Sequence, residues 1–215
     1  KKILHLIDGK PMVVHVYEQA VKAKSLDDVI VAIDADETET SLNEWKVKTI
    51  MTSDNHVSGT DRIQEAVVDI EADVVVNIQG DEPTINPLLI DELVQQFEDT
   101  TIEMATVAGQ DMDVENIMDV NAVKVLLDGG GFAVNFRREP VETEAGGYYH
   151  HMGIYAYRKA TLEKFTALAP SKNELALKLE QYRALDNGIP IKVILVDKVN
   201  KGIDTMDDLK EFDRI

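Results

Sequence analysis

The sequence predicts an α/β fold, built as a three-layer, mostly parallel sheet that carries an inserted β-rich subdomain. Two observations predict it. Short β-branched apolar runs alternate with segments of helical periodicity through the first half of the chain, as in parallel sheets covered by helices. A glycine-rich turn between apolar runs in residues 121–136 then breaks this alternation and indicates a hairpin. We therefore expect one domain over residues 1–215, with the insertion at about 121–157.

The composition argues against several classes of function. The 215 residues include 22 Lys and Arg against 40 Asp and Glu, a formal net charge of −18. Such a charge repels polyanions, so we expect neither nucleic acid nor an anionic membrane as a partner. Cysteine is absent, which excludes disulfides and thiolate chemistry. No apolar run has the length of a membrane span and no signal peptide pattern is visible, so we expect a cytoplasmic protein.

The first elements are expected to be helices and short strands. Residues 12–23 place apolar side chains at helical spacing after the turn signal Asp8-Gly9-Lys10-Pro11. Residues 29–33 and 47–51 are apolar, partly β-branched runs typical of buried strands. The acidic segment 36–44 between them favours a solvated helix.

A loop rich in hydroxyl and amide groups, residues 52–62, follows and leads into a helix expected at about 61–70. Thr60 or Asp61 is the expected N-cap of this helix. The N–H groups at such a terminus suit a phosphate or a nucleobase edge, and Arg62 could bind an oxygen through its fork. A capped surface helix with a polar approach loop is the alternative.

Residues 72–83, which read ADVVVNIQGDEP, form the strongest candidate site. The polar end of this segment contains a turn residue, Gly80, and the adjacent carboxylates Asp81 and Glu82. Carboxylates at the carboxyl end of a buried strand lie where open α/β sheets bind ligands, although an ordinary solvated turn is the alternative. The apolar part indicates a strand buried on both faces, with four residues in the core: Val74, Val75, Val76 and Ile78.

The remaining elements follow from the same patterns. An acidic loop to Gly147 separates the hairpin from the next strand. We expect helices at 86–97, 161–169 and 173–185, strands at 104–108, 121–127, 132–136, 148–157 and 191–196, and a C-terminal helix that begins at Asp207.

Six short motifs carry a resemblance to a known family. In order along the chain they are HVSGTDR at 56–62, QGDEP at 79–83, NAVKV at 121–125, HMGIY at 151–155, LEQYR at 179–183 and GIDT at 202–205. Together they resemble 3-deoxy-manno-octulosonate cytidylyltransferase, the CMP-Kdo synthetase family, over nearly the whole chain.

The resemblance implies a nucleotide-diphospho-sugar transferase fold of Rossmann-like type. It also implies the reaction of CTP with an acidic 3-deoxy-2-ulosonic sugar to give CMP-sugar and pyrophosphate, for lipopolysaccharide biosynthesis. Mg²⁺ is the implied cofactor and a homodimer the implied assembly. The implied site residues are Lys2, Asp81 and Asp204 for catalysis, with Asp81 and Asp204 on the metal; Ser58, Gly59, Thr60, Arg62 and Gln79 on the nucleotide; and Arg138, His151, Tyr155, Glu174 and Gln181 on the sugar.

The chain departs from the family pattern in two places. Of the family's triphosphate loop only the final Lys is matched, by Lys2, so we expect an upstream segment that carries the loop. On the sugar side, Leu177 replaces a Glu, while Glu139 and Glu142 are additional carboxylates. We hypothesise from this that the substrate is an 8-amino variant of Kdo. A cytidylyltransferase for another acidic sugar, such as a sialic acid, and a non-catalytic nucleotide-binding protein are the alternatives.

Overall fold

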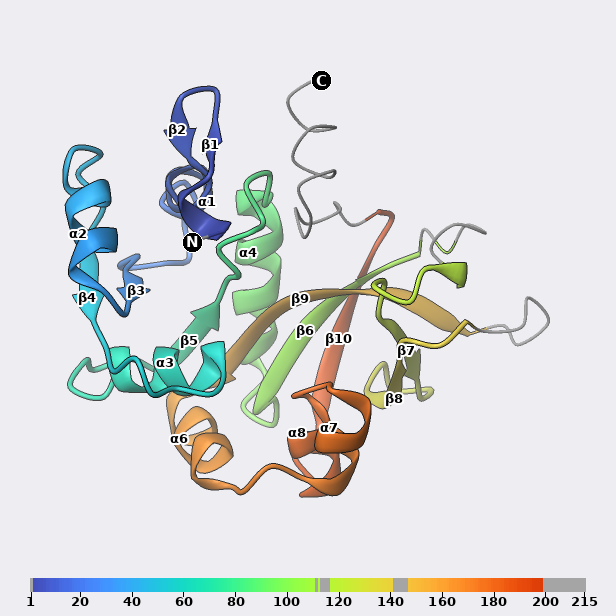
Figure 1. Ribbon diagram of the computed structural model, residues 1–215. Coiled ribbons are helices and arrows are strands. Elements are labelled where there is room, and N and C mark those ends of the chain that lie inside the picture. The colour runs from blue at the N-terminus through green and yellow to red at the C-terminus, as the bar shows by residue number, and fades with distance from the viewer. Residues whose placement is uncertain (1, 111, 113–116, 141–146, 199–215) are drawn as a thin grey trace. The chain divides into compact units, whose positions relative to one another are not determined.

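The computed structural model describes residues 2–110, 112, 117–140 and 147–198, which fold into two compact units (Figure 1). The first unit contains the described residues up to Glu71 together with Asn77–Gln95. The second contains Ala72–Val76 and the described residues from Gln96 onward. The fold therefore has to be followed in each unit separately.

The first unit has two small sheets and four α-helices among its described residues. Its core is formed by apolar side chains from one helix, the strand after it, the next helix and the segment that leads to the following strand, namely Val13, Val14, Ile33, Leu42 and Val47. The strands β1 (Leu6–Ile7) and β2 (Lys10–Pro11) are antiparallel, while β3 (Val31–Ile33) and β4 (Thr49–Met51) are parallel. The helices are the 3-10 turn η1 (Lys2–Leu4) and α1 (Met12–Ala20), α2 (Asp36–Asn43), α3 (Gly59–Ala66) and α4 (Pro87–Gln95).

Helix α3 begins earlier than the sequence predicts. Its N-cap is Ser58, whose Oγ accepts a hydrogen bond from the Asp61 backbone N–H at 3.1 Å. The expectation that Thr60 or Asp61 caps the helix is therefore wrong. Both side chains lie in the first turn, and Thr60 is buried there. Ser is a strong N-cap residue, and its hydroxyl reaches the N–H three positions ahead.

Strand β5 (Val74–Asn77) is half-buried, not buried on both faces. Of its residues only Val75 and Asn77 are buried, in strict alternation, whereas Val74 and Val76 are partly exposed. The expected core set is therefore wrong except for Val75. The polar Asn77 is accommodated because its Nδ2 lies 3.4 Å from Thr60 Oγ1 in α3.

The second unit is built on a six-stranded mixed sheet with the order β10-β6-β9-β7-β8, in which β5 also pairs with β9. The pair β10–β6 is parallel, and β6–β9, β9–β7 and β7–β8 are antiparallel. The strands are β6 (Met104–Gly109), β7 (Lys124–Leu127), β8 (Ala133–Arg137), β9 (Tyr148–Arg158) and β10 (Ile191–Val196); the helices are η2 (Gln96–Glu98), α6 (Lys159–Ala167), α7 (Lys172–Leu177) and α8 (Tyr182–Asp186).

The expected hairpin is present as β7 and β8, and its turn packs against the far edge of the sheet. The Val193 N–H of β10 donates to Gly131 O at 3.0 Å, and Lys192 Nζ donates to Gly130 O at 2.7 Å. Lys192 also lies over the Phe132 ring, 5.0 Å from its centroid. Because β8 and β10 are the two ends of the strand order, these contacts show that the sheet curls.

The helix expected at residues 173–185 is two helices. Helix α7 ends at Leu177, Lys178 takes a left-handed conformation with φ 55°, and α8 begins at Tyr182. The apolar pattern continues through the break, so periodicity alone did not predict it. A Lys at the left-handed position gives no glycine signal for the end of the helix.

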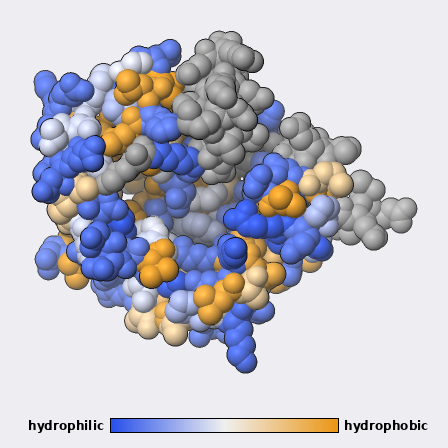
Figure 2. Space-filling model, in the orientation of Figure 1, coloured by the Kyte–Doolittle hydropathy of each residue, from blue (hydrophilic) through white to orange (hydrophobic). Residues whose placement is uncertain are grey.

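The described surface is predominantly hydrophilic on the face shown in Figure 2. Charged residues make up 29% of the sequence. Within the described ranges, we find no helix with the length and apolar character required to cross a membrane.

Candidate active site

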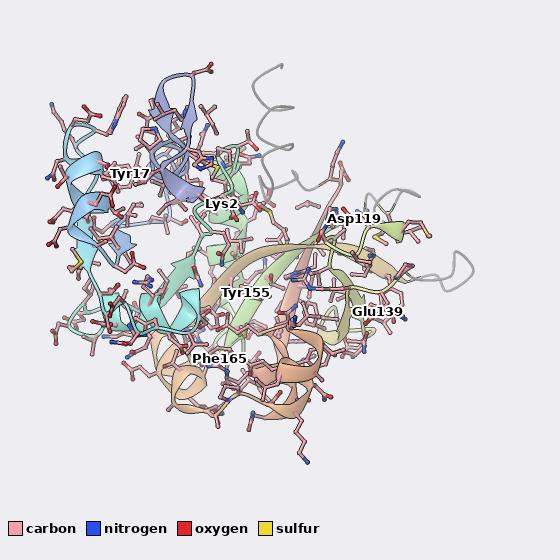
Figure 3. All side chains as sticks on the ribbon, in the orientation of Figure 1. Lys2, Tyr17, Asp119, Glu139, Tyr155 and Phe165 are labelled. Carbon is pink, nitrogen blue, oxygen red and sulfur yellow. The ribbon has the colours of Figure 1, made fainter. Side chains whose placement is uncertain are left out.

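The residues predicted to bind the nucleotide lie in the first unit, where Lys2 of η1 contacts Asp81. Lys2, which is labelled in Figure 3, donates from Nζ to Asp81 Oδ2 at 2.8 Å. Both side chains remain partly open to solvent. The neighbouring residues are also in close contact, because a Cβ at Gly80 would lie 2.9 Å from Ile3 Cγ2. Glycine at position 80 therefore lets the segment after β5 pack against Ile3 of η1 without displacing the Ile3 side chain.

The residues on either side of Asp81 differ in exposure. Gln79 is exposed, as a ligand contact requires, whereas Glu82 is buried. Glu82 donates its N–H to Gln79 O at 3.4 Å and accepts from Ile85 N–H at 3.0 Å, so the chain turns here. The two adjacent carboxylates thus have different environments, and only Asp81 remains accessible.

Helix α3 contributes the other nucleotide candidates. Ser58 caps the helix and Gly59 begins it, with no atom within 4 Å of where a Cβ would be. Arg62 is engaged within the protein. Its Nη1 donates to Thr52 Oγ1 at 2.7 Å and Ser53 O at 3.1 Å, and its Nη2 pairs with Asp34 Oδ2 at 3.0 Å. Arg62 therefore joins the ends of β3 and β4, and its contact with a nucleotide stays a prediction.

Glu65 is a structural residue of this loop that the sequence analysis did not identify. Its carboxylate accepts from the Ser53 N–H at 3.1 and 3.2 Å and pairs with His56 Nε2. The hydrogen bond from His56 and then that from Ser53 lower the pKa of Glu65. Glu65 of α3 therefore binds two residues of the loop, Ser53 and His56. In the sequence, the only signal of this role was a His and a Glu nine positions apart.

The residues predicted to bind the sugar lie in the second unit and include two buried aromatic residues of β9, His151 and Tyr155. Their ring centroids are 5.5 Å apart, and Figure 3 shows Tyr155. His151 Nε2 lies 3.0 Å from the Thr106 hydroxyl of β6. Burial lowers the pKa of His151 to about 3, so the imidazole is neutral at pH 7. Burial also raises the pKa of Tyr155 well above its ordinary value.

Arg138 follows β8, and a buried lysine holds its backbone. Lys124 Nζ donates to Arg138 O at 3.0 Å and also to Asp119 O, and Arg138 Nη1 donates to Asn121 O at 3.2 Å. Desolvation lowers the pKa of Lys124. Sequence reasoning missed this lysine, although a single cation inside the apolar NAVKV motif was a visible signal.

Glu174 and Gln181 are both buried, but Glu174 has strong partners inside the protein. Its carboxylate accepts from Arg183 at 2.6, 3.0 and 3.2 Å, and it also accepts from Ser171 N–H in a capping box at the start of α7. A sugar contact by Glu174 therefore stays a prediction, and its observed role is to join α7 to α8. Gln181 stands at the N-cap position of α8.

The metal ligands are only partly covered by the structure. Asp204, the predicted partner of Asp81, lies outside the described residues. Within the described part of the chain, no group of three or more His, Asp or Glu side chains could hold a metal ion. Asp81 is thus the one predicted metal ligand whose surroundings are known.

Comparison with known proteins identifies the class. A family model described as "Cytidylyltransferase" matches residues 1–194. A solved structure of CMP:2-keto-3-deoxy-manno-octonic acid synthetase complexed with CTP is similar, with a TM-score of 0.92 and 35% identity over 99% of this chain and 90% of that chain. A 4-diphosphocytidyl-2C-methyl-D-erythritol synthase from Anaerococcus prevotii shares the fold, with a TM-score of 0.65 at 14% identity over 99% and 91% of the two chains. The α/β class expected from the sequence is confirmed, and the protein is a nucleotidyltransferase.

Curated relatives identify the family more closely. A 3-deoxy-manno-octulosonate cytidylyltransferase of Chloroherpeton thalassium is 40% identical over 100% of this chain and 91% of its own length. Another, from Lawsonia intracellularis, is 41% identical over 95% of this chain and 84% of its own length. The chain belongs to the 3-deoxy-manno-octulosonate cytidylyltransferase family, which confirms the resemblance carried by the six motifs.

Proposed function

We propose that this chain activates 3-deoxy-manno-octulosonate with CTP, forming the CMP-sugar and pyrophosphate. The proposal is supported by the relatives of that name and by the similar structure complexed with CTP. The observation that carries it in this chain is the Lys2–Asp81 pair at 2.8 Å. It places a cation and a carboxylate together at the end of β5, where a triphosphate and its counter-ion would be held.

The reaction is an in-line displacement at phosphorus. The anomeric hydroxyl of the sugar attacks the α-phosphorus, a new P–O bond forms, and the bond to pyrophosphate breaks. The protein's task is to position the two reactants and to offset the negative charge that develops on the phosphate oxygens. We propose that Lys2 offsets the negative charge of the nucleotide. Ser58, Thr60 and Gln79 would contact the nucleotide through their hydroxyl and amide groups.

Asp81 fits the implied Mg²⁺. Its carboxylate is accessible, only Oδ2 is engaged by Lys2, and no other described residue bonds to Oδ1. Mg²⁺ uses one or two carboxylates together with substrate phosphates, and Asp204 would be the second. When bound, the ion would supply Lewis-acid stabilisation of the phosphate oxygens.

The sugar side is assigned to the second unit. We propose that Arg138 binds the ulosonate carboxylate through its guanidinium fork. His151, Tyr155 and Gln181 would then contact the hydroxyl groups. The hypothesis of an 8-amino substrate stays untested, but Glu139 is exposed and lies 3.9 Å from Arg137, so its charge is partly offset. We therefore propose, in place of that hypothesis, that the unmodified sugar is preferred.

The assembly and location are further proposals. We propose a homodimer formed through the inserted region, because Val134 on the edge strand β8 is half exposed. Sedimentation velocity would give one species with twice the 24.0 kDa monomer mass, and a monomer at micromolar concentration would contradict this. A cytoplasmic location suits a chain without cysteine that uses CTP.

The experiment is pyrophosphate release from CTP and Mg²⁺ with the plain sugar, the 8-amino sugar, a sialic acid or no sugar. We expect release only with the octulosonates, and Asp81→Asn should lower kcat about 100-fold. Asp69→Asn, a change of the same kind at an exposed aspartate of the first unit, should have no effect. Release that is independent of any sugar, or an Asp81→Asn variant within threefold of the wild type, would refute the proposal.

A further inference from the structure

The sheet of the second unit contains an irregularity beside His151. Thr106 of β6 pairs with Tyr155 of β9, but the next β6 residue, Val107, pairs with Met152. Two residues of β9, Gly153 and Ile154, therefore have no partner in β6. A bulge of this kind removes backbone groups from the regular ladder, and bulges often redirect a side chain near a functional site.

The Thr106 hydroxyl lies at this bulge, and three polar atoms are within hydrogen-bonding distance of its oxygen. The side chain is completely buried, with Oγ1 2.7 Å from Ile154 O, 3.0 Å from His151 Nε2 and 3.3 Å from Met152 O. A threonine hydroxyl can donate only one hydrogen bond. Ile154 O is the nearest acceptor, at 2.7 Å against 3.3 Å for Met152 O, so we assign the hydroxyl proton to this bond.

The proton on Thr106 determines the proton on His151. If the hydroxyl donates to Ile154 O, it can only accept from Nε2, which must then carry a hydrogen. The ring is also held by aromatic contacts. Its centroid lies 5.1 Å from that of Phe136 in an edge-to-face arrangement and 5.5 Å from that of Tyr155. No described residue bonds to the other nitrogen, Nδ1.

We propose that Thr106 is a positioning residue that fixes His151 as the Nε2–H tautomer, so that Nδ1 accepts a hydrogen bond from a hydroxyl of the sugar substrate. The tautomer follows from the geometry of this chain alone, whereas the sugar as its ligand rests on the proposed function.

The charge state of His151 agrees with this role. Burial is the main reason that its pKa is low, and the nearby charges of His150 and Arg138 act in the same direction. A neutral imidazole cannot form an ion pair with the carboxylate of the sugar. It can select for a hydroxyl at one position, and the carboxylate is left to the guanidinium of Arg138.

The first test is the tautomer of His151 in the free protein. Nitrogen-15 spectra at pH 7 separate protonated from unprotonated ring nitrogens, and the His151 signals among the five histidines are identified by their loss in His151→Gln. We expect Nε2 protonated and Nδ1 bare. A protonated Nδ1, a mixture of tautomers or an imidazolium would overturn the proposal whether or not any variant folds.

The second test asks whether the hydroxyl matters for the sugar. Thr106→Val should raise the KM for the octulosonate about tenfold and leave the KM for CTP within twofold, with a mixed or altered His151 tautomer. Thr106→Ser keeps the hydroxyl and should restore the wild-type KM for the octulosonate and the wild-type tautomer of His151. Thr161→Val removes another buried hydroxyl of the same unit, which lies 3.4 Å from Glu103 Oε2, and should leave both KM values unchanged.

These outcomes separate the two proposals. An unchanged sugar KM in a folded Thr106→Val, or equal rises in both KM values, would refute the positioning role. Wild-type protein that releases no pyrophosphate with any octulosonate would refute the proposed function, while the nitrogen-15 spectrum would still decide the tautomer. If Thr106→Val does not fold, Thr106→Ser must reproduce the wild-type spectrum and KM values, and failure to do so refutes the role.

Discussion

Replacing Glu174 by glutamine should destabilise the second unit more than it affects the sugar KM. Arg183 is 4% exposed, and its closest contact to Glu174 is 2.6 Å. Glu174→Gln leaves the guanidinium buried without its main counter-charge. Glutamine still suits the third position of the Ser171 capping box, so the cap itself is retained.

The size of the effect follows from the remaining partners of Arg183. Breaking a buried ion pair from one side costs about 3–5 kcal/mol. Glu180 at 3.9 Å and the Phe165 ring at 4.9 Å from the guanidinium stay in place and should recover about 1–2 kcal/mol. We therefore expect a loss of about 1–4 kcal/mol, or a decrease in Tm of about 2–16 °C for a chain of this size.

The assay is thermal unfolding followed by circular dichroism and calorimetry, with pyrophosphate release measured on the same samples. Glu180→Gln is the matched control, since its carboxylate is more distant and more exposed, and it should cost less than about 1 kcal/mol. A Glu174→Gln variant with unchanged Tm and a sugar KM raised tenfold or more would refute this reasoning. Glu174 would then be the sugar contact that the family resemblance implied.

Three further predictions test other contacts. Because the pKa of His151 is depressed to about 3, the unfolded chain binds more protons than the folded protein below pH 6.5. Between pH 6.5 and pH 3 the free energy of unfolding should therefore fall by roughly 3–6 kcal/mol more in the wild type than in His151→Gln. Parallel curves of unfolding free energy against pH for the two proteins would contradict this. Gly80→Ala should cost about 1–2 kcal/mol through the 2.9 Å approach to Ile3 Cγ2, and in an Ile3→Ala background, which lacks that atom, the same urea titrations should show most of this cost removed. Tyr182→Phe should cost about 1–3 kcal/mol in the same titrations, because the Tyr182 hydroxyl donates to Phe136 O at 2.7 Å, and a loss below 0.5 kcal/mol would show that water replaces it.

The sequence by itself determined the elements with strong local patterns. The β-branched run at 191–196 and the glycine turn before Phe132 predict a strand and a hairpin that the structure contains. Short-range periodicity and turn chemistry are enough for these, because the responsible residues are neighbours in the chain. The six motifs, in order, likewise indicated the cytidylyltransferase family that the comparisons confirm.

Only the tertiary structure decided which polar residues are committed to the protein itself. The family resemblance implies ligand contacts for Arg62 and Glu174, but Asp34 and Arg183, distant in sequence or across a helix break, bind them within the fold. Thr106 gave no signal, since its role depends on a bulge in a strand 45 or more positions away. Partners of this kind are set by strand register and side-chain packing, which no local pattern encodes.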